Sequence, residues 1–286
     1  MSGGVLYVVS TPIGNLSDVT LRSLEVLRAV PLIAAEDTTL TRRLLSRYEI
    51  GVRTISYHAQ SDPRRETELL THLRGGGDLA LVTDAGTPGV SDPGDALVAA
   101  WAAEGGRVVP VPGASAVLAA IAGSGIAGPR WCFEGFLPRS GRDWRERLAA
   151  IATDRRGAVL FESPGRAAAT LRDLAAVCGA RRIGAVCREL TKLHEQVVRG
   201  PLGELAAAAA PGGTIPAKGE FVIVVGMARD DDLAVAPEVE AARVAAALAA
   251  VEALIRSGTS RGEAAKQVSI DTGIPRRRLY DVADRP

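Results

Sequence analysis

Cysteine is scarce in this chain. Three cysteines, Cys132, Cys178 and Cys187, occur among 286 residues, and no two of them form a CxxC pair. The sequence also does not open with the basic and then apolar segment of a secretory leader. These absences exclude a scaffold built on disulfides and a cysteine zinc cluster, and they favour a reducing, cytoplasmic location.

Long apolar runs and an excess of one charge are also missing. The most apolar long stretch, residues 241–255, is interrupted by Arg243 and Glu252, and a membrane span needs about 18 uninterrupted apolar residues. The 34 Lys+Arg nearly balance the 33 Asp+Glu, which leaves a net charge of +1. We therefore expect no transmembrane helix, and any surface for a polyanion must be local.

Several common catalytic motifs do not occur. The chain has no Walker A loop, no HExxH and no GxSxG. Residues 123–128 satisfy GxGxxG, but a predicted helix precedes them and Pro129 follows, whereas the dinucleotide fingerprint needs a strand before it and a helix after it. This segment is predicted to be a bend between domains, and no metal site is expected.

Predicted strands and helices alternate along most of the chain, which is typical of an α/β fold with a largely parallel sheet. The pattern predicts an N-terminal α/β domain over 1–122, a second α/β domain over 129–228 and a helical extension over 238–286, joined by a linker from Asp230 to Pro237. In the extension the predicted helices span 238–255, 261–272 and 276–283.

Three predicted loops that follow strands of the first domain, residues 10–18, 83–94 and 110–116, are rich in Gly, Pro, Ser, Thr and Asp. Parallel sheets bind ligands outside the carboxyl ends of their strands, so these loops are site candidates. Glycine lets a ligand approach the backbone, and proline stiffens the loop. The alternative is a turn-rich connection capped by Ser91 or Asp92, with Ser115 as an ordinary helix N-cap.

Six segments of the sequence, taken together, resemble those of a known protein family. They are Tyr7–Leu16, Ala35–Thr38, Thr83–Gly94, Val111–Ala116, Phe161–Arg166 and Arg188–Glu195. In this order and spacing the sequence resembles the tetrapyrrole methylase superfamily, and within it the branch of ribosomal RNA small subunit methyltransferase I, which methylates the ribose 2′-oxygen of a decoding-region cytidine. The resemblance implies a two-domain tetrapyrrole-methylase-like architecture with a helix-turn-helix-like C-terminal extension. The chain departs from the branch at Thr39 and at 59–61, which concerns RNA contacts.

The resemblance also implies S-adenosylmethionine as the methyl donor, bound in a cleft between the two α/β domains. The positions that match the family's donor pocket are Pro12, Asp84, Ala85, Gly86, Thr87, Val90, Ser91, Ser115, Ala116, Ser163, Leu190, Thr191, Ala217, Lys218 and Gly219. A sulfonium favours oxygen atoms over cations, and Asp84 is the carboxylate expected in that role.

Two groups could assist removal of the hydroxyl proton. The first is Glu36 with Asp37, for which the alternative is that Asp37 caps a helix. The second is Lys192, His194 and Glu195, for which the alternative is a solvated histidine at a strand end. The sequence does not assign the base, and placement of the reactants can itself lower such a barrier by roughly 7–11 kcal/mol.

Local basic segments are candidates for RNA contacts. One such segment holds Arg139, Arg142 and Arg145 near Phe136 and Trp144 in the sequence, a pattern that suits phosphate contacts with base stacking. The alternative is a solvated helix face with ion pairs. Arg276, Arg277 and Arg278 follow a predicted turn at Gly273 and resemble the branch's helix-turn-helix extension; the alternative is a structural or dimer-stabilising tail.

The predicted function is methylation of 16S ribosomal RNA in the small ribosomal subunit by a cytoplasmic homodimer, the dimer being implied by the superfamily. One rival is a precorrin or uroporphyrinogen methyltransferase, for which a basic helical tail has no evident use. The other is a nucleic-acid-binding regulator that senses a ligand without catalysis.

Overall fold

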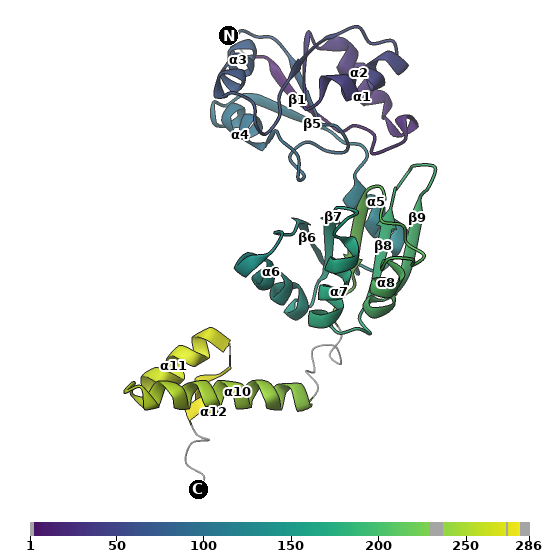
Figure 1. The fold of residues 1–286 in the computed structure, drawn as a ribbon. Helices are drawn as coiled ribbons and strands as arrows, with labels where there is room; N and C mark the ends of the chain where they lie inside the picture. The colour runs from purple at the N-terminus through teal and green to yellow at the C-terminus, as the bar shows by residue number, and fades with distance from the viewer. Residues whose placement is uncertain (1–2, 229–236, 273, 281–286) are drawn as a thin grey trace. The chain divides into compact units, whose positions relative to one another are not determined.

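The computed structural model describes residues 3–228, 237–272 and 274–280. The chain divides into two compact units, residues 1–228 and 229–286 (Figure 1). The first holds two sheets with their helices, and the second is helical in its described part. The predicted linker at 230–236, the turn at Gly273 and the predicted helix end at 281–283 lie outside the described residues.

The first sheet is parallel throughout. Its strands are β1 (Val5–Val9), β2 (Leu32–Ala35), β3 (Arg53–Ser56), β4 (Leu79–Val82) and β5 (Arg107–Val111). They run in the order β3-β2-β4-β1-β5. The α/β prediction is confirmed. Because all strands point the same way, their carboxyl ends and the three predicted loops share one edge.

Helices cover both faces of this sheet. They are α1 (Leu21–Ala29), α2 (Thr38–Arg47), α3 (Pro63–Arg74) and α4 (Asp95–Ala103), with the short 3-10 turn η1 at Leu16–Asp18. Leu69 and Leu97 from α3 and α4 pack on one face, and Leu27 and Leu45 from α1 and α2 on the other. Both faces are thereby buried, which is why β2 and β4 consist only of apolar residues.

The second sheet is mixed. Its strands are β6 (Trp131–Phe136), β7 (Gly157–Glu162), β8 (Ile183–Arg188), β9 (Gln196–Pro201) and β10 (Phe221–Val225). The order is β6-β7-β10-β8-β9, and β10 runs antiparallel to both β7 and β8. Phe221, the first residue of β10, is paired with Glu162 and with Arg188. The ends of β7 and β8 and the start of β10 therefore meet at one edge.

Helix α5 (Ala116–Ser124) connects the two sheets. Its residues Val117 and Ala120 are buried with Val159 and Ala185 of the second sheet. Helices α6 (Gly141–Thr153), α7 (Ala167–Cys178) and α8 (Leu202–Ala208) supply Leu148, Leu171 and Leu205, among others, to the opposite face. The predicted boundary at residue 122 assigns most of α5 to the first domain, whereas the buried residues of α5 pack on the second sheet.

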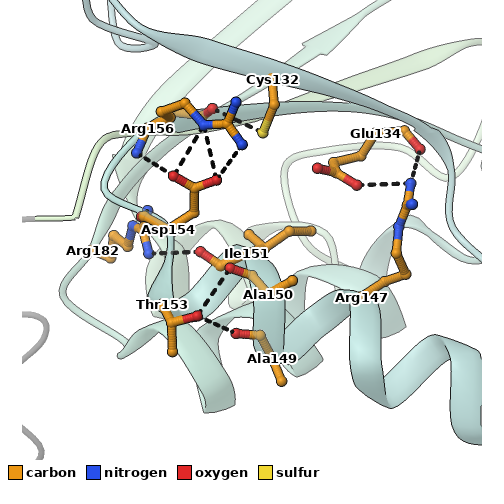
Figure 2. Close-up of polar contacts among 11 residues, drawn as sticks. Cys132, Glu134, Arg147, Ala149, Ala150, Ile151, Thr153, Asp154, Arg156 and Arg182 are labelled. Carbon is orange, nitrogen blue, oxygen red and sulfur yellow. Dashed lines mark hydrogen bonds and ion pairs between the residues drawn. The ribbon is translucent and has the colours of Figure 1, made fainter.

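One buried arginine closes the far end of the second sheet. Arg182 is 1% exposed, and its guanidinium donates to the carbonyls of Gly226, Ile151 and Ala152. Beside it the Asp154 carboxylate accepts hydrogen bonds from Arg156, and Arg147 reaches Glu134 (Figure 2). Arg182 ties the end of α6 to the start of β8 and the end of β10, and Arg147 ties α6 to β6. Carbonyls left free at the end of the helix are thereby satisfied by a charged donor.

The second unit contains α10 (Pro237–Arg256), α11 (Arg261–Thr272) and α12 (Arg276–Tyr280). Ala247, Val251, Val268 and Leu279 belong to its own buried core. None of the described helices is long and apolar enough to cross a membrane. The predicted succession of three helices is confirmed over the described residues.

Candidate functional site

The three predicted loops of the first sheet are hydrogen-bonded to one another. The Thr11 N–H donates to the Gly86 carbonyl at 2.8 Å, and the Gly86 N–H donates to the Thr11 carbonyl at 3.1 Å. The hydroxyl oxygens of Ser10 and Thr87 lie 2.9 Å apart, and the Thr87 hydroxyl also donates to the Ala114 carbonyl at 3.4 Å. Gly86 has φ +96°, a conformation that glycine adopts freely. The loops therefore form one connected wall.

Carboxylates lie at the ends of β2 and β4. The Glu36 carboxylate accepts the N–H of Asp84 at 3.2 Å, and the Asp84 carboxylate accepts the N–H of Asp37 at 2.9 Å. Burial raises the pKa of both Glu36 and Asp84 above their ordinary values. Asp37 instead caps α2, and hydrogen bonds from the N–H groups of Thr39 and Leu40 lower its pKa. Glu36 is thus the better proton acceptor of the predicted pair.

Asp92 is a third carboxylate of this wall, and it was not among the predicted site residues. It accepts a hydrogen bond from the Thr83 hydroxyl at 3.2 Å. Burial, followed by the charges of Glu36 and Asp84, raises the pKa of Asp92 to about 6. The glycines and prolines around Asp92 favoured a prediction in which the backbone of this loop, and not the Asp92 side chain, binds the ligand. Its position nine residues after Thr83, in the same loop, was the available signal.

The predicted residues of the second sheet gather at its edge. Ser163 follows β7, Leu190 and Thr191 follow β8, and residues 217–219 precede β10, so the pairing of Phe221 places all three segments at one end. Thr191 has φ +67°, and its hydroxyl oxygen is buried without a hydrogen-bond partner among the described residues. The Glu195 carboxylate accepts the Thr191 N–H at 2.6 Å and holds this turn.

Lys192 lies in the turn after β8 and pairs with two carboxylates at the edge of the second sheet. Its ammonium lies 3.0 Å from a Glu189 oxygen and 3.1 Å from a Glu220 oxygen. Burial alone would lower the pKa of Lys192, but the two ion pairs outweigh it and the pKa is raised. Lys192 therefore stays protonated at neutral pH and is no general base.

A cavity of about 450 Å³ spans both edges. Its lining includes Thr11, Pro12, Ile13, Gly14, Arg43, Asp84, Ala85, Lys192 and Glu220. Pro12, Asp84, Ala85 and Lys192 were predicted, whereas Arg43 and Glu220 were not. Leu190 and Ala116 pack with Ile13 and Val90 in a shared apolar cluster. Residues of the first domain's loops and of the second sheet's edge thus share a cavity and a core.

Other predicted residues lie around this cavity rather than in it. Thr87, Val90 and Ser115 line a neighbouring apolar hollow of about 410 Å³. Ser91 lines another, of about 520 Å³, with Glu36 and Asp92. His194 is exposed, and its carbonyl accepts from Arg188 at 3.3 Å. Ser163 is exposed, and its N–H donates to the buried Glu162 carboxylate at 2.7 Å.

The predicted RNA-contact residues are exposed. Arg139 and Arg145 flank Arg142, which pairs with Glu146 at 2.6 Å. The run 276–278 forms most of α12 in the second unit, beside the buried Leu279.

The amino-acid sequence matches a family of known proteins. Residues 5–206 match the model of the Tetrapyrrole (Corrin/Porphyrin) Methylases. A protein of Synechocystis named ribosomal RNA small subunit methyltransferase I is 43% identical over 98% of this chain and 97% of its own length. A protein of the same name from Bacillus subtilis is 38% identical over 97% of this chain and 93% of its own.

Solved structures share the fold. The methyltransferase CobJ superposes with a TM-score of 0.61 at 22% identity, over 79% of this chain and 95% of that one. Uroporphyrin-III C-methyltransferase from Thermus thermophilus, in complex with S-adenosylhomocysteine, gives 0.56 at 19% identity, over 78% and 97%. The family match and the near full-length similarity agree with each other, and this chain belongs to the tetrapyrrole methylases and, within them, to the family of ribosomal RNA small subunit methyltransferase I.

Proposed function

We propose that this protein transfers a methyl group from S-adenosylmethionine to the ribose 2′-hydroxyl of a cytidine in the decoding region of 16S ribosomal RNA. The observation that carries the proposal is the 43% identity, over nearly the whole of both chains, to a relative named ribosomal RNA small subunit methyltransferase I. The C-terminal helices are included in that match, and the tetrapyrrole-methylating neighbours are similar over the fold alone.

The residues at the two edges suit this donor. The buried Thr191 hydroxyl has no hydrogen-bond partner among the described residues, Ala85 beside the buried Gly86 is exposed, and Asp84 supplies a carboxylate for a cation. We propose that donor contacts come from Pro12, residues 84–87, Val90, Ser91, Ser115, Ala116, Ser163, Leu190, Thr191 and residues 217–219. When bound, the donor supplies an electrophilic methyl group.

The chain's own residues place the ribose and accept its proton. We propose Glu36 as the acceptor of the 2′-hydroxyl proton, because its raised pKa brings it closer to neutral pH than an ordinary carboxyl. Asp37 orients α2 as its cap, and Glu195 holds the Thr191 turn. The Lys192 ammonium, paired with Glu189 and Glu220, keeps these two carboxylates in place beside the proposed donor residues. His194 is exposed, and its backbone carbonyl accepts from Arg188, so we propose no catalytic role for its side chain.

RNA binding is proposed on two surfaces. One comprises Arg139, Arg142 and Arg145, and the other Arg276, Arg277 and Arg278. Basic side chains on exposed helices are suited to phosphate contacts that weaken with salt. We further propose a homodimer that acts in the cytoplasm on the small ribosomal subunit.

A methyl-transfer assay with labelled S-adenosylmethionine tests the function. Small subunits from cells that lack this protein, free ribosomal RNA and a uroporphyrinogen are offered in parallel, and the labelled nucleotide is mapped. Label on one cytidine 2′-oxygen of the subunit is the expected result. Label on the macrocycle would assign the protein to tetrapyrrole methylation. No label, with tight nucleic-acid binding, would favour a regulator. Light scattering of the purified protein tests the dimer.

A further inference from the structure

An exposed aromatic ring stands at the edge of the second sheet. Phe136, the last residue of β6, is 58% exposed, although a phenylalanine of this size is usually buried. Its ring lies 5.5 Å from that of Phe161 in a tilted arrangement, and Phe161 lies 4.9 Å from Phe133 edge-on. The three rings support one another, so the outermost has a fixed place while much of its surface remains free.

The backbone brings this ring beside the proposed donor loops. The register of β6 and β7 shifts between Phe133 and Gly135, and Gly135 has φ +61°. Such a bulge re-aims the side chains that follow it. A β-carbon on Gly135 would lie 3.1 Å from the Ser91 hydroxyl oxygen. Phe136 pairs with Phe161 in the register, two residues before Ser163, and so lies at the site edge of the sheet.

Two of the cations that follow Phe136 are unpaired in the part of the chain that the structure describes. Arg139 and Arg145 are exposed, and neither has a hydrogen bond or an ion pair among the described residues. Arg147 differs, because it donates to the carbonyl of Glu134 and pairs with its carboxylate at 2.8 Å (Figure 2). That contact fastens α6 to β6. Arg139 lies in the short segment between Phe136 and α6, and Arg145 lies on α6, the helix that Arg147 fastens to β6.

Resting on the function proposed above, we propose that an unpaired base of the substrate RNA stacks on Phe136 while Arg139 and Arg145 contact its phosphates. An aromatic face beside free guanidinium groups matches single-stranded RNA, whose bases have π-faces and whose backbone is anionic. A second protein chain fits less well, because the residues that follow Phe136 do not extend an apolar surface: Leu137 is buried and Arg139 is charged and exposed.

The test compares Phe136→Leu with Phe136→Trp in the full-length chain, with small subunits as substrate. Phe136→Leu is expected to raise the KM for subunits about tenfold, as base–aromatic stacking implies, and to leave the affinity for S-adenosylmethionine unchanged by calorimetry. Phe136→Trp is expected to restore the wild-type KM. Val177→Ala, on an exposed apolar side chain of α7, is the control and is expected to change neither value.

Binding to a short single-stranded oligoribonucleotide at several salt concentrations is independent of catalysis. Phe136→Leu is expected to weaken binding without changing the salt slope, whereas Arg139→Gln and Arg145→Gln each reduce the slope by about one. The proposed stacking on Phe136 would be overturned by any of four results: unchanged binding by Phe136→Leu, no recovery of the KM in Phe136→Trp, a parallel loss of donor affinity, or a changed oligomeric mass. Wild-type protein that labels no RNA, yet binds the oligoribonucleotide through Phe136, would instead contradict the proposed function.

Discussion

Gly14 leaves just enough room for the side chain of Lys192. A β-carbon at position 14 would lie 2.5 Å from Cγ and 2.7 Å from Cε of Lys192. Lys192 fills this gap on its way to Glu189 and Glu220, so the first domain's loop and the second domain's edge depend on the absence of one methyl group. The contact couples the placement of one half of the site to the other.

Gly14→Ala is expected to displace Lys192 from both glutamates and to lower donor affinity, because Glu189 and Glu220 adjoin the proposed donor residues and lose the ion pairs that hold them in place. Lys192→Met should lower it in the same way, and the double variant should be no worse than either single variant. Calorimetric titration with S-adenosylmethionine measures this. Fully additive losses in the double variant would show that Gly14 acts independently of Lys192. Gly51→Ala, where a β-carbon meets nothing, is the matched control.

Glu36→Gln should lower kcat by about 100-fold or more while donor affinity stays the same, because the amide cannot accept the hydroxyl proton. Single-turnover methylation of small subunits measures the effect. Glu25→Gln, on an exposed position of α1, should behave as wild type. If Glu36→Gln retains full kcat, placement of the reactants suffices and Glu36 is not the base.

Asp92→Asn should stabilise the protein, relative to wild type, more at neutral pH than at acid pH. The folded-state pKa of Asp92 is about 6, above the ordinary 3.8, so the protonated carboxyl is the form that folding favours. Its stabilising contribution is complete below about pH 4 and is lost as pH rises through 6. The asparagine side chain does not ionise and can still accept the Thr83 hydrogen bond.

Urea unfolding at pH 4 and pH 7 measures this difference. The free energy of unfolding of Asp92→Asn, taken relative to wild type, should be higher at pH 7 than at pH 4 by about 1 kcal/mol. This value is smaller than the full pKa shift implies, because the side chain is half-buried and screened by water. An equal difference at both pH values would mean that Asp92 has an ordinary pKa.

Ala116→Val should lower donor affinity with little effect on stability, because this residue begins α5 and is only partly buried. Gly86→Val differs from it: a valine at φ +96° is strained, so it should lower both donor affinity and the free energy of unfolding, the latter by about 1–3 kcal/mol. Calorimetry and thermal unfolding separate the two effects. Unchanged donor affinity in both variants would contradict the proposed pocket.

Replacing Arg276, Arg277 and Arg278 together by Gln should weaken RNA binding at low salt and flatten its salt dependence, with donor affinity intact. The mutated side chains are exposed, so α12 should still pack through Leu279. Circular dichroism checks the fold, and binding to ribosomal RNA across a salt series checks the prediction. An unchanged slope would assign the extension a structural role.

The first sheet and its loops could be predicted because local patterns define them. Buried runs such as Leu79–Val82 end at Gly- and Pro-rich loops, and parallel order puts those loops on one edge. The strand Arg53–Ser56 gave no such signal, since it is a four-residue edge strand without full burial. Helix 116–124 is apolar on every side, and its periodicity does not say which sheet it covers.

The candidate site was predictable only in part, because local sequence patterns do not show which distant residues meet. The sequence prediction named residues in loops of unusual composition, and it named Lys192 within its motif. The partners that settle its protonation, Glu189 and Glu220, are distant from one another in sequence, and only the pairing of β10 with β8 unites them. Asp37 was weighed both as a base and as a cap, and the hydrogen bonds to Thr39 and Leu40 decide for the cap.

The central place of β10 affects how the protein is made. β10 is the last strand of its sheet to be synthesised, yet it separates β7 from β8. Until residues 221–225 leave the ribosome, the nascent chain can form only two separate ribbons, β6 with β7 and β8 with β9, and two-stranded ribbons are marginal in water. Translation that stops before Phe221 would leave the inner edges of β7 and β8 open to aggregation.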